Sequence, residues 1–420
     1  MINSIVLGNF KCFRELEVNP RLVTVFVGPN GTGKSSVLQA LALMKQSAGG
    51  GSLNLDGGLV NLPDPQAIIP KFEGPSRPLR IGFGGIYTQS NFSEFGFGER
   101  VPFGYEASFS GPNVVAYTSQ AHSLYQGTSL SISAKDASVS PTHIETGPYS
   151  LTLQPSTTLA HVAEVGTWTE PPESRGSEVR RGFTDMLHAP SRVLNIMRLV
   201  PSARGFTRPN YSLRADTADD ISLPGGYDSQ EEQAATNLAY ARETERALSD
   251  RLKSVTGVGL RGRVVPNRAV AVESLTPLGA INIVAEGFGS NALVQLFMQV
   301  NDASPGATVM IEEPEIHLHP RAQAGLASVL AEEAVDENKQ LIMTTHSEHV
   351  IGRLLTMVAE DGLSRDNLAI YAFEKDEEGV CTARELEVTA DGRVKGGIKD
   401  FFETDLDELD RYIKALQPSE

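Results

Sequence analysis

The sequence contains little cysteine and no long apolar run. Its two cysteines, Cys12 and Cys381, are too few for the disulfide framework of a secreted protein, which favours a reducing compartment. No stretch of about 18 consecutive apolar residues occurs, and the N-terminus lacks the apolar core of an export signal. We therefore expect a cytoplasmic protein with no membrane-spanning segment and no membrane partner.

The chain is also short of basic side chains. Lysine and arginine number 36 against 52 aspartates and glutamates, which gives a formal net charge of −16. Proteins that coat nucleic acid bind it through basic side chains that displace counterions, so the overall charge disfavours this class and leaves only a local basic groove. At about 100–200 residues per domain, 420 residues suggest two or three structural units.

What the sequence does contain is a strand, a glycine-rich loop and a helix in succession. An apolar run at residues 21–28 is followed by "GPNGTGKSS" and then by apolar residues at helical spacing. The spacing G-x-x-x-x-G-K-S from Gly28 to Ser35 is typical of a loop whose backbone N–H groups surround phosphates. Lys34 can reach the terminal phosphates and Ser35 can ligate magnesium. The loop residues expected to bind nucleotide are Asn30, Gly31, Thr32, Gly33, Lys34, Ser35 and Ser36.

An acidic stretch, "VMIEEPEIHLHP" at residues 309–320, ends a second apolar run. One interpretation is a buried strand whose end places Glu312 near magnesium and Glu313 near the terminal phosphate, where it can deprotonate the attacking water. The rival interpretation is a zinc or iron site, because imidazole and carboxylate are the ligands of such metals. Its candidate ligands are Glu312, Glu313, Glu315, His317 and His319. Magnesium prefers oxygen ligands, which favours the first interpretation.

Two further segments can meet phosphate. His346 in "TTHSEH" follows the apolar run "QLIM" and can contact the terminal phosphate or the water, and Ser347 is expected to cap the next helix. In "EGFGSNAL", Gly287, Gly289, Ser290 and Asn291 precede an apolar helix whose free amides form an anion site. One chain needs only one site for the terminal phosphate, so this second site favours two chains arranged head to tail.

The spacing of strands and helices predicts how the chain is organised. Strands alternating with helices in residues 269–375, together with residues 1–60, predict an α/β fold with a mostly parallel sheet. Residues 61–180 are predicted to form a β-rich insertion and residues 181–268 a helical insertion, with helical patterning at residues 183–200 and again at residues 229–255. Residues 376–420 are expected to form a C-terminal extension that ends in an amphipathic helix.

Together these motifs resemble a known group of proteins. "NFKCF", "GPNGTGKSS", "EGFGSNAL", "MIEEPEIHLHP" and "TTHSEH", in this order, resemble the ABC-type ATPases of the RecF, SMC and overcoming-lysogenization-defect (OLD) group, within which the likeness to predicted bacterial AAA-type ATPases is greatest. The resemblance implies a P-loop NTPase fold with an ABC-ATPase-like head, and hydrolysis of ATP with Mg²⁺. It also implies roles for individual residues: Walker A at residues 28–36, Walker B at Glu312 and catalytic Glu313, a signature motif at residues 287–291, a D-loop at His319 and Pro320, a switch histidine at His346 and a Q-loop glutamine at Gln66.

The sequence departs from the pattern of this group in three places. Glu312 stands where Walker B usually has aspartate, and "EGFGSN" differs from the transporter-type "LSGGQ". About 75 residues follow His346, too few for the Toprim nuclease domain of the OLD nucleases. The C-terminal segment "GGIKDFF" is similar to that of Toprim-less relatives.

The resemblance leads to one leading function and two alternatives. The leading function is a homodimeric or larger ATPase that switches a partner effector, a nuclease or toxin encoded nearby, in defence against phage. The first alternative is a RecF- or SMC-like DNA clamp for repair, whose candidate basic patches lie at residues 180–183 and 261–268. The second is a transporter ATPase, which the signature motif and the large insertion disfavour.

Overall fold

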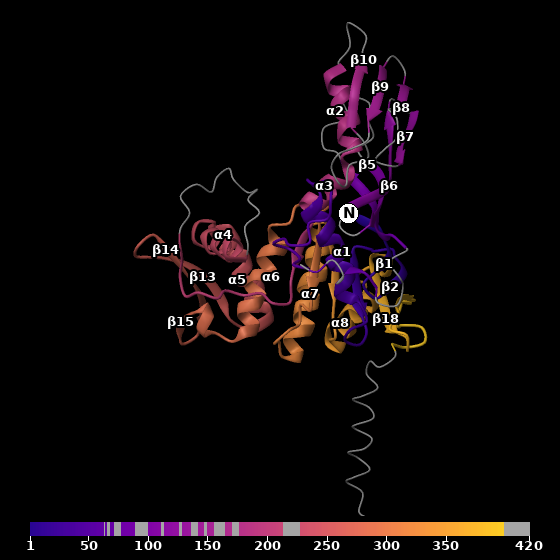
Figure 1. Cartoon of the computed structure of the whole chain (residues 1–420). Coiled ribbons are helices and arrows are strands. Elements are labelled where there is room, and N and C mark those ends of the chain that lie inside the picture. Colours follow the sequence, from indigo (N-terminus) through magenta and orange to yellow (C-terminus); the bar gives the residue numbers. More distant parts are fainter. Residues whose placement is uncertain are drawn as a thin grey trace, which may run out of the picture.

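The computed structural model describes residues 1–62, 64, 68–70, 77–88, 100–110, 113–125, 128–135, 142–146, 149–154, 164–169, 176–212 and 227–398. These residues form two six-stranded sheets, a four-stranded sheet and a three-stranded sheet. Figure 1 shows the chain in sequence colours, with the four-stranded sheet and its helices forming a lobe at one side. Gln66 and the amphipathic helix expected beyond residue 398 lie outside the described residues, as do residues 214–226, whose composition predicts an exposed loop.

The central sheet brings together strands from both ends of the chain. Its order is β11 (Arg198–Val200), β16 (Thr308–Glu312), β17 (Gln340–Thr344), β3 (Val23–Val27), β18 (Leu368–Lys375) and β19 (Cys381–Leu386). All neighbours are parallel except β18 and β19. The expected α/β fold is thus confirmed, and the N-terminal strand joins the same sheet as the C-terminal ones.

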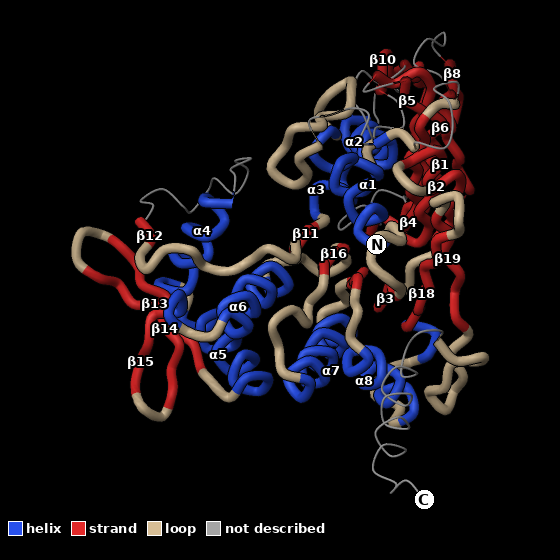
Figure 2. Tube along the Cα trace, turned by 60° about the horizontal axis from the view of Figure 1, so that its bottom comes forward, coloured by secondary structure: helices blue, strands red, loops and turns tan. Residues whose placement is uncertain are grey.

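Both faces of this sheet are covered, which explains the nearly continuous apolar strands. Phe26, Met310 and Ile342 share one hydrophobic cluster with α1 (Lys34–Ser47). Neighbouring positions such as Val25 and Ile311 share the other cluster with three helices. These are α6 (Phe288–Asn301), α7 (Pro320–Asp336) and α8 (Glu348–Ala359). Figure 2 shows α1 on one side of β3, with α7 and α8 on the other.

The second large sheet is antiparallel and also crosses the sequence. Its order is β2 (Phe13–Val18), β1 (Ile2–Phe10), β4 (Leu79–Thr88), β5 (Arg100–Ser110), β6 (Asn113–Tyr125) and β7 (Thr128–Lys135). Strands β8 (Thr142–Thr146), β9 (Tyr149–Gln154) and β10 (Glu164–Thr169) form the three-stranded sheet. Residues 61–180 are therefore rich in strands as expected, but β4 pairs with the N-terminal β1, so one hydrogen-bonded ladder spans the boundary at 60/61.

The helices expected between residues 181 and 268 are present, with two corrections. The helix expected through residues 183–200 is two helices, α2 (Gly176–Leu187) and α3 (Ala189–Ile196), and Arg198–Val200 is instead the edge strand β11. Hydrogen bonding to β16 decides its conformation. The next helical segment divides into α4 (Tyr227–Tyr240) and α5 (Arg242–Thr256).

The four-stranded sheet packs beside α4 and α5 and leads into the second half of the α/β core. Its strands are β12 (Tyr211–Ser212), β13 (Gly259–Val265), β14 (Ala269–Thr276) and β15 (Gly279–Asn282). The division expected at 268/269 lies in the turn between the paired strands β13 and β14. A short 3-10 helix, Ile283–Ala285, then leads to α6. No helix in the described part of the chain is both long and apolar enough to span a bilayer.

Candidate nucleotide-binding site

The glycine-rich loop connects β3 to α1 in a backbone shape that needs glycine. Gly28, Gly31 and Gly33 all have positive φ. A Cβ on Gly28 would lie only 2.3 Å from the carbonyl oxygen of Phe373, so β18 packs directly on the start of the loop. Lys34 opens α1, and its Nζ donates hydrogen bonds of 2.8 Å to the carbonyls of both Gly28 and Pro29. The loop therefore closes around a lysine at a helix N-terminus, as phosphate binding requires.

A cleft of about 350 Å³ lies over this loop. It brings predicted residues from three distant segments together: the loop residues, Glu313 after β16 and His346 after β17. Thr32 is the predicted loop residue absent from the lining, because its side chain is buried and its hydroxyl donates to the carbonyl of Pro29. The lining residues are Lys11, Cys12, Asn30, Gly31, Gly33, Lys34, Ser35, Ser36, Gln39, Glu313 and His346.

Ser35 and Glu312 form an oxygen-rich corner beside the cleft. Burial raises the pKa of Glu312, while hydrogen bonds from the Ser202 backbone and the Ser35 hydroxyl lower it in part. A hydroxyl and a carboxylate held together are the oxygen ligands that Mg²⁺ accepts at a nucleotide site. The residues present therefore fit a divalent cation brought by a nucleotide.

Glu313 leaves the strand in a strained conformation. Its φ is 44°, and its N–H donates to the carbonyl of Thr344 at 3.0 Å, which anchors the turn to β17. The carboxylate then faces His346, with 3.9 Å between Oε1 and Nε2. Burial and the nearby Lys34 lower the pKa of His346, although Glu313 opposes this shift. The histidine is consequently neutral near pH 7 and can accept or donate a hydrogen bond.

Glu315 connects the acidic segment after β16 to the segment after β17 that carries His346. The residue is 8 % exposed, and Oε1 accepts hydrogen bonds from the Thr345 hydroxyl at 2.7 Å and the His346 N–H at 2.8 Å. Burial raises its pKa. Ser347 caps α8 by accepting a hydrogen bond from the Val350 N–H, which confirms the expected cap. Glu315 thus positions His346 and does not face the cleft lining.

The candidate zinc or iron ligands point to different places. No group of three or more His, Cys, Asp or Glu within the described ranges is arranged to hold a metal ion. His319 accepts the N–H of Arg321 as the N-cap of α7, with Pro320 at the first helical position. The His317 ring packs edge-on against Phe288, with 4.6 Å between the ring centroids. These contacts favour the nucleotide interpretation of "EEPEIHLHP".

The segment predicted as a signature motif opens a second pocket, of about 510 Å³. Gly287 caps α6, and Gly289 packs so closely that a Cβ there would lie 2.6 Å from the carbonyl of His317. Gly287, Gly289 and Ser290 line this pocket with His317, His319 and Arg321. The helix N-terminus predicted from the sequence thus lies in an open pocket, next to His319 of the expected D-loop.

Asn291 was expected to bind nucleotide with its neighbours, but the structure places it away from the pocket. Its side chain is 6 % exposed and is absent from the pocket lining. Oδ1 accepts the Phe206 N–H at 2.7 Å and Nδ2 donates to the Phe206 carbonyl at 2.9 Å. One helical position after Ser290, the side chain faces inward, so it binds the backbone of a neighbouring segment instead of facing a ligand.

Besides the predicted residues, the structure brings Lys11 and Arg204 to the site. Lys11 lies in the cleft with positive φ, and its Nζ donates to Gln39 on α1. Burial lowers its pKa, whereas Cys12 and Glu312 raise it. Arg204 lies beneath the turn after β16 and is 6 % exposed. Lys11 belongs to the motif "NFKCF", whereas no pattern in "PSARGF" marks Arg204.

Comparison with known proteins agrees with this geometry. Residues 1–83 and 279–351 match the family model described as AAA ATPase domain. The OLD nuclease of Thermus scotoductus (strain ATCC 700910 / SA-01) is 24% identical over 411 residues, which cover 90% of this chain and 65% of that protein. The chain thus spans less than two thirds of the length of this relative.

A solved structure shows the same overall fold. The Smc head domain with an extended coiled coil, bound to the C-terminal domain of ScpA and derived from Pyrococcus furiosus, superposes with a TM-score of 0.50 at 14% identity, covering 98% of this chain and 99% of that chain. The SMC head domain from Thermotoga maritima gives a TM-score of 0.43 at 13% identity, covering 92% and 99%. The match to the AAA ATPase domain model and the phosphate loop support an ATP-hydrolysing enzyme, and the chain is similar in sequence to an OLD nuclease and in fold to an Smc head domain.

Proposed function

We propose that this protein hydrolyses ATP between two copies of the chain arranged head to tail. The observation that carries the proposal is the separation of its two anion-binding surfaces. The cleft at Lys34 and the pocket at Ser290 share no lining residue, and each presents a helix N-terminus. A second copy could therefore present its Ser290 pocket to the terminal phosphate held at Lys34.

The residues of the cleft divide the work of hydrolysis. Lys34 and the loop amides bind the phosphates, and Lys34 can release the Gly28 and Pro29 carbonyls to do so. Glu313 accepts a proton from the attacking water, and His346 orients that water or the terminal phosphate. Gly287, Gly289 and Ser290 of the second copy complete the site. Gln66 stays a sequence-based proposal for a cation ligand.

Ser35 and Glu312 would hold the cation, for which we propose Mg²⁺. When bound with the nucleotide, a divalent cation neutralises phosphate charge during transfer. The chain itself supplies oxygen ligands at this corner and a buried carboxylate, which favours magnesium over a softer metal.

The substitution Glu313→Gln tests this function. It removes the proton acceptor but keeps the shape, so phosphate release should fall by about 10²–10⁴-fold while ATP is retained. Light scattering with ATP and Mg²⁺ should show the variant as a dimer or larger oligomer. A variant that stays monomeric under these conditions would contradict the head-to-tail arrangement.

We further propose that the ATPase switches a protein effector, a nuclease or toxin encoded nearby, in cytoplasmic defence against phage. The likeness to an OLD nuclease supports this role. The domain division into ATPase core (1–60 and 269–375), insertions (61–180 and 181–268) and extension (376–420) belongs to the same proposal, with the insertions as the contact region. Affinity purification of the Glu313→Gln variant with ATP should retain the effector, and purification without ATP should not.

A DNA clamp is the alternative function, and the structure weakens one of its candidate patches. Glu273 accepts hydrogen bonds from both Arg261 and Arg263, at 2.6 Å and 2.7 Å. A single carboxylate thus neutralises part of this patch, and the paired guanidiniums are less available to phosphate. Salt-dependent binding of duplex DNA that needs ATP and is lost on changing Arg261 and Arg263 to alanine would favour the clamp.

A further inference from the structure

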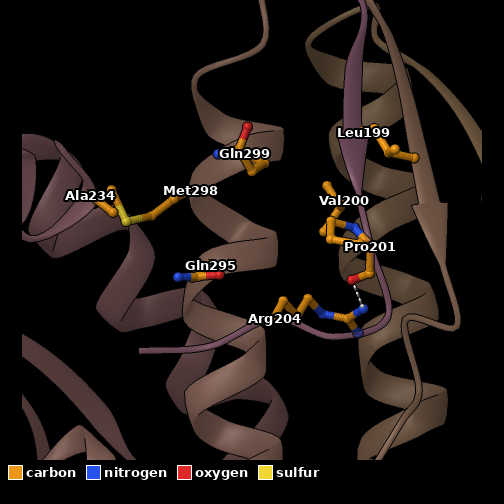
Figure 3. Close-up of a pocket in the computed structure, with 8 residues that line it drawn as sticks. All are labelled: Leu199, Val200, Pro201, Arg204, Ala234, Gln295, Met298 and Gln299. Atoms are coloured by element: carbon orange, nitrogen blue, oxygen red, sulfur yellow. Dashed lines mark hydrogen bonds between the residues drawn. The ribbon is translucent and has the colours of Figure 1, made fainter. Parts of the chain in front are cut away.

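A short segment between β11 and β12 contacts both halves of the proposed ATP site. Residues 201–206 begin directly after β11, and they contact both the turn that carries Glu313 and the helix α6 that carries Ser290. Figure 3 shows Arg204 of this segment lying between α6, with Gln295, and the segment's own Pro201. Neither the cleft nor the second pocket includes Arg204 in its lining.

Arg204 binds only backbone carbonyls, and most of them belong to the turn after β16. Nη1 donates to the carbonyls of Pro201 at 2.9 Å and Glu312 at 2.8 Å. Nη2 donates to those of Glu313 at 3.0 Å and Pro314 at 3.1 Å. Three consecutive carbonyls around the left-handed residue Glu313 therefore point at one guanidinium, which fixes the direction of the backbone where it is strained.

The same segment is bound by two side chains of α6. Gln295 accepts the Gly205 N–H at 2.9 Å and donates to the Gly205 carbonyl at 3.0 Å. Asn291 makes the matching pair of hydrogen bonds with Phe206. Adjacent residues of one segment thus bind the Glu313 turn on one side and helix α6 on the other.

We propose that Arg204 is a positioning residue for hydrolysis, and that residues 201–206 couple the placement of Glu313 to the position of the signature helix α6. The inference rests on the proposed function, because Glu313, the residue that Arg204 positions, is the proton acceptor of that function. Arg204 lies outside the linings of both the cleft and the second pocket, so it acts through the backbone and not on the reacting atoms. Its guanidinium holds the backbone from Glu312 to Pro314, and a second chain docking on the N-terminus of α6 would act on that backbone through Asn291 and Gln295.

The test compares Arg204→Met with Arg204→Lys in the full-length chain. Methionine keeps length but leaves the three carbonyls without their donor, so the Glu313 carboxylate should lose its placement. A displacement of about 1 Å costs about 100-fold in rate, so kcat should fall by about that factor. The KM for ATP and the affinity for a fluorescent ATP analogue should stay within about threefold, since the phosphate loop is untouched. Lysine, which can donate to some of the carbonyls, should restore part of kcat.

Arg198→Met is the matched control. Arg198 is half-buried and also binds α6, but at its C-terminal end, through Gln299 at 3.0 Å and the Asp302 carbonyl at 2.9 Å. Its loss should lower the melting temperature with kcat per folded chain unchanged. Parental kcat in both Arg204 variants, or equal loss of kcat and nucleotide affinity in Arg204→Met and Arg198→Met, would overturn the proposal.

Two other outcomes are distinguishable from these. If Arg204→Met does not fold, Arg204→Lys decides, because lower kcat at parental nucleotide affinity supports positioning and parental kcat overturns it. If the parent chain itself releases no phosphate from ATP with Mg²⁺, the proposed function fails and Arg204 has no proton acceptor to position.

Discussion

Nε2 of His346 lies 3.9 Å from Oε1 of Glu313, although the two residues follow different strands of the central sheet. The parallel neighbours β16 and β17 end at the same edge, and Glu315 fixes the His346 backbone from below. This gap is longer than a direct hydrogen bond, so the pair can both face one group in the cleft. The relationship therefore favours joint action on a water or phosphate.

Acidification should destabilise the protein partly through His346. Its folded-state pKa lies below the ordinary value of 6.5, so the unfolded chain takes up the proton first as the pH falls. The stability that depends on neutral His346 is present above about pH 6.5 and is lost as the pH falls towards the lower folded pKa. Between about pH 7.5 and about pH 5.5 the melting temperature should fall further in the parent than in His346→Gln. An equal fall in both proteins would contradict the lowered pKa of His346.

Two lysines of α1 should separate nucleotide binding from stability. Lys34→Met should weaken binding of a fluorescent ATP analogue by about 2 kcal/mol or more, because a buried charge partner of the phosphates is removed. Lys45 on the same helix donates to the carbonyls of Leu194 and Asn195 instead, and burial lowers its pKa to about 8. Lys45→Met should lower the melting temperature while nucleotide affinity stays near the parental value.

Two glycines of the loop should respond differently to alanine. Gly28→Ala places a Cβ against the Phe373 carbonyl at a φ of +138°. Backbone strain alone costs about 1–3 kcal/mol, so urea denaturation should show that the free energy of unfolding falls by more than this. At Gly31 the Cβ would meet nothing within 4 Å, and only the strain of a φ of +76° remains. A Gly28→Ala variant as stable as Gly31→Ala would argue against the close approach of β18.

Mixing two inactive variants should restore hydrolysis if the site is shared between chains. Lys34→Met lacks the phosphate lysine but keeps Ser290, and Ser290→Glu repels phosphate while its carboxylate suits a helix N-terminus. Half of the randomly formed dimers then contain one intact site of two, so phosphate release should reach about a quarter of the parental rate in a symmetric dimer. Each variant alone should be inactive. A mixture as inactive as its components would contradict the shared site.

The site was largely predictable because its motifs are local. The shape of a phosphate loop depends on glycines and a lysine within nine residues, and Ser347 caps the helix that immediately follows it. Asn291 was assigned by proximity to Ser290, but one residue along a helix turns the side chain by about 100°, and here it faces Phe206. Helical periodicity also extended α3 into Arg198–Val200, because pairing with β16 is not visible in local sequence.

The sequence by itself determined the α/β core, the loop at Lys34 and the carboxylates after β16, since apolar runs, glycine spacing and strand-end polar residues act within a few positions. Only the tertiary structure decided that β1 pairs with β4, that Lys11 enters the cleft and that Arg204 lies under Glu313. The β1–β4 pairing and the Arg204–Glu313 contact join residues about 70 to 110 positions apart. Packing of the whole chain selects the partners of such buried backbone groups.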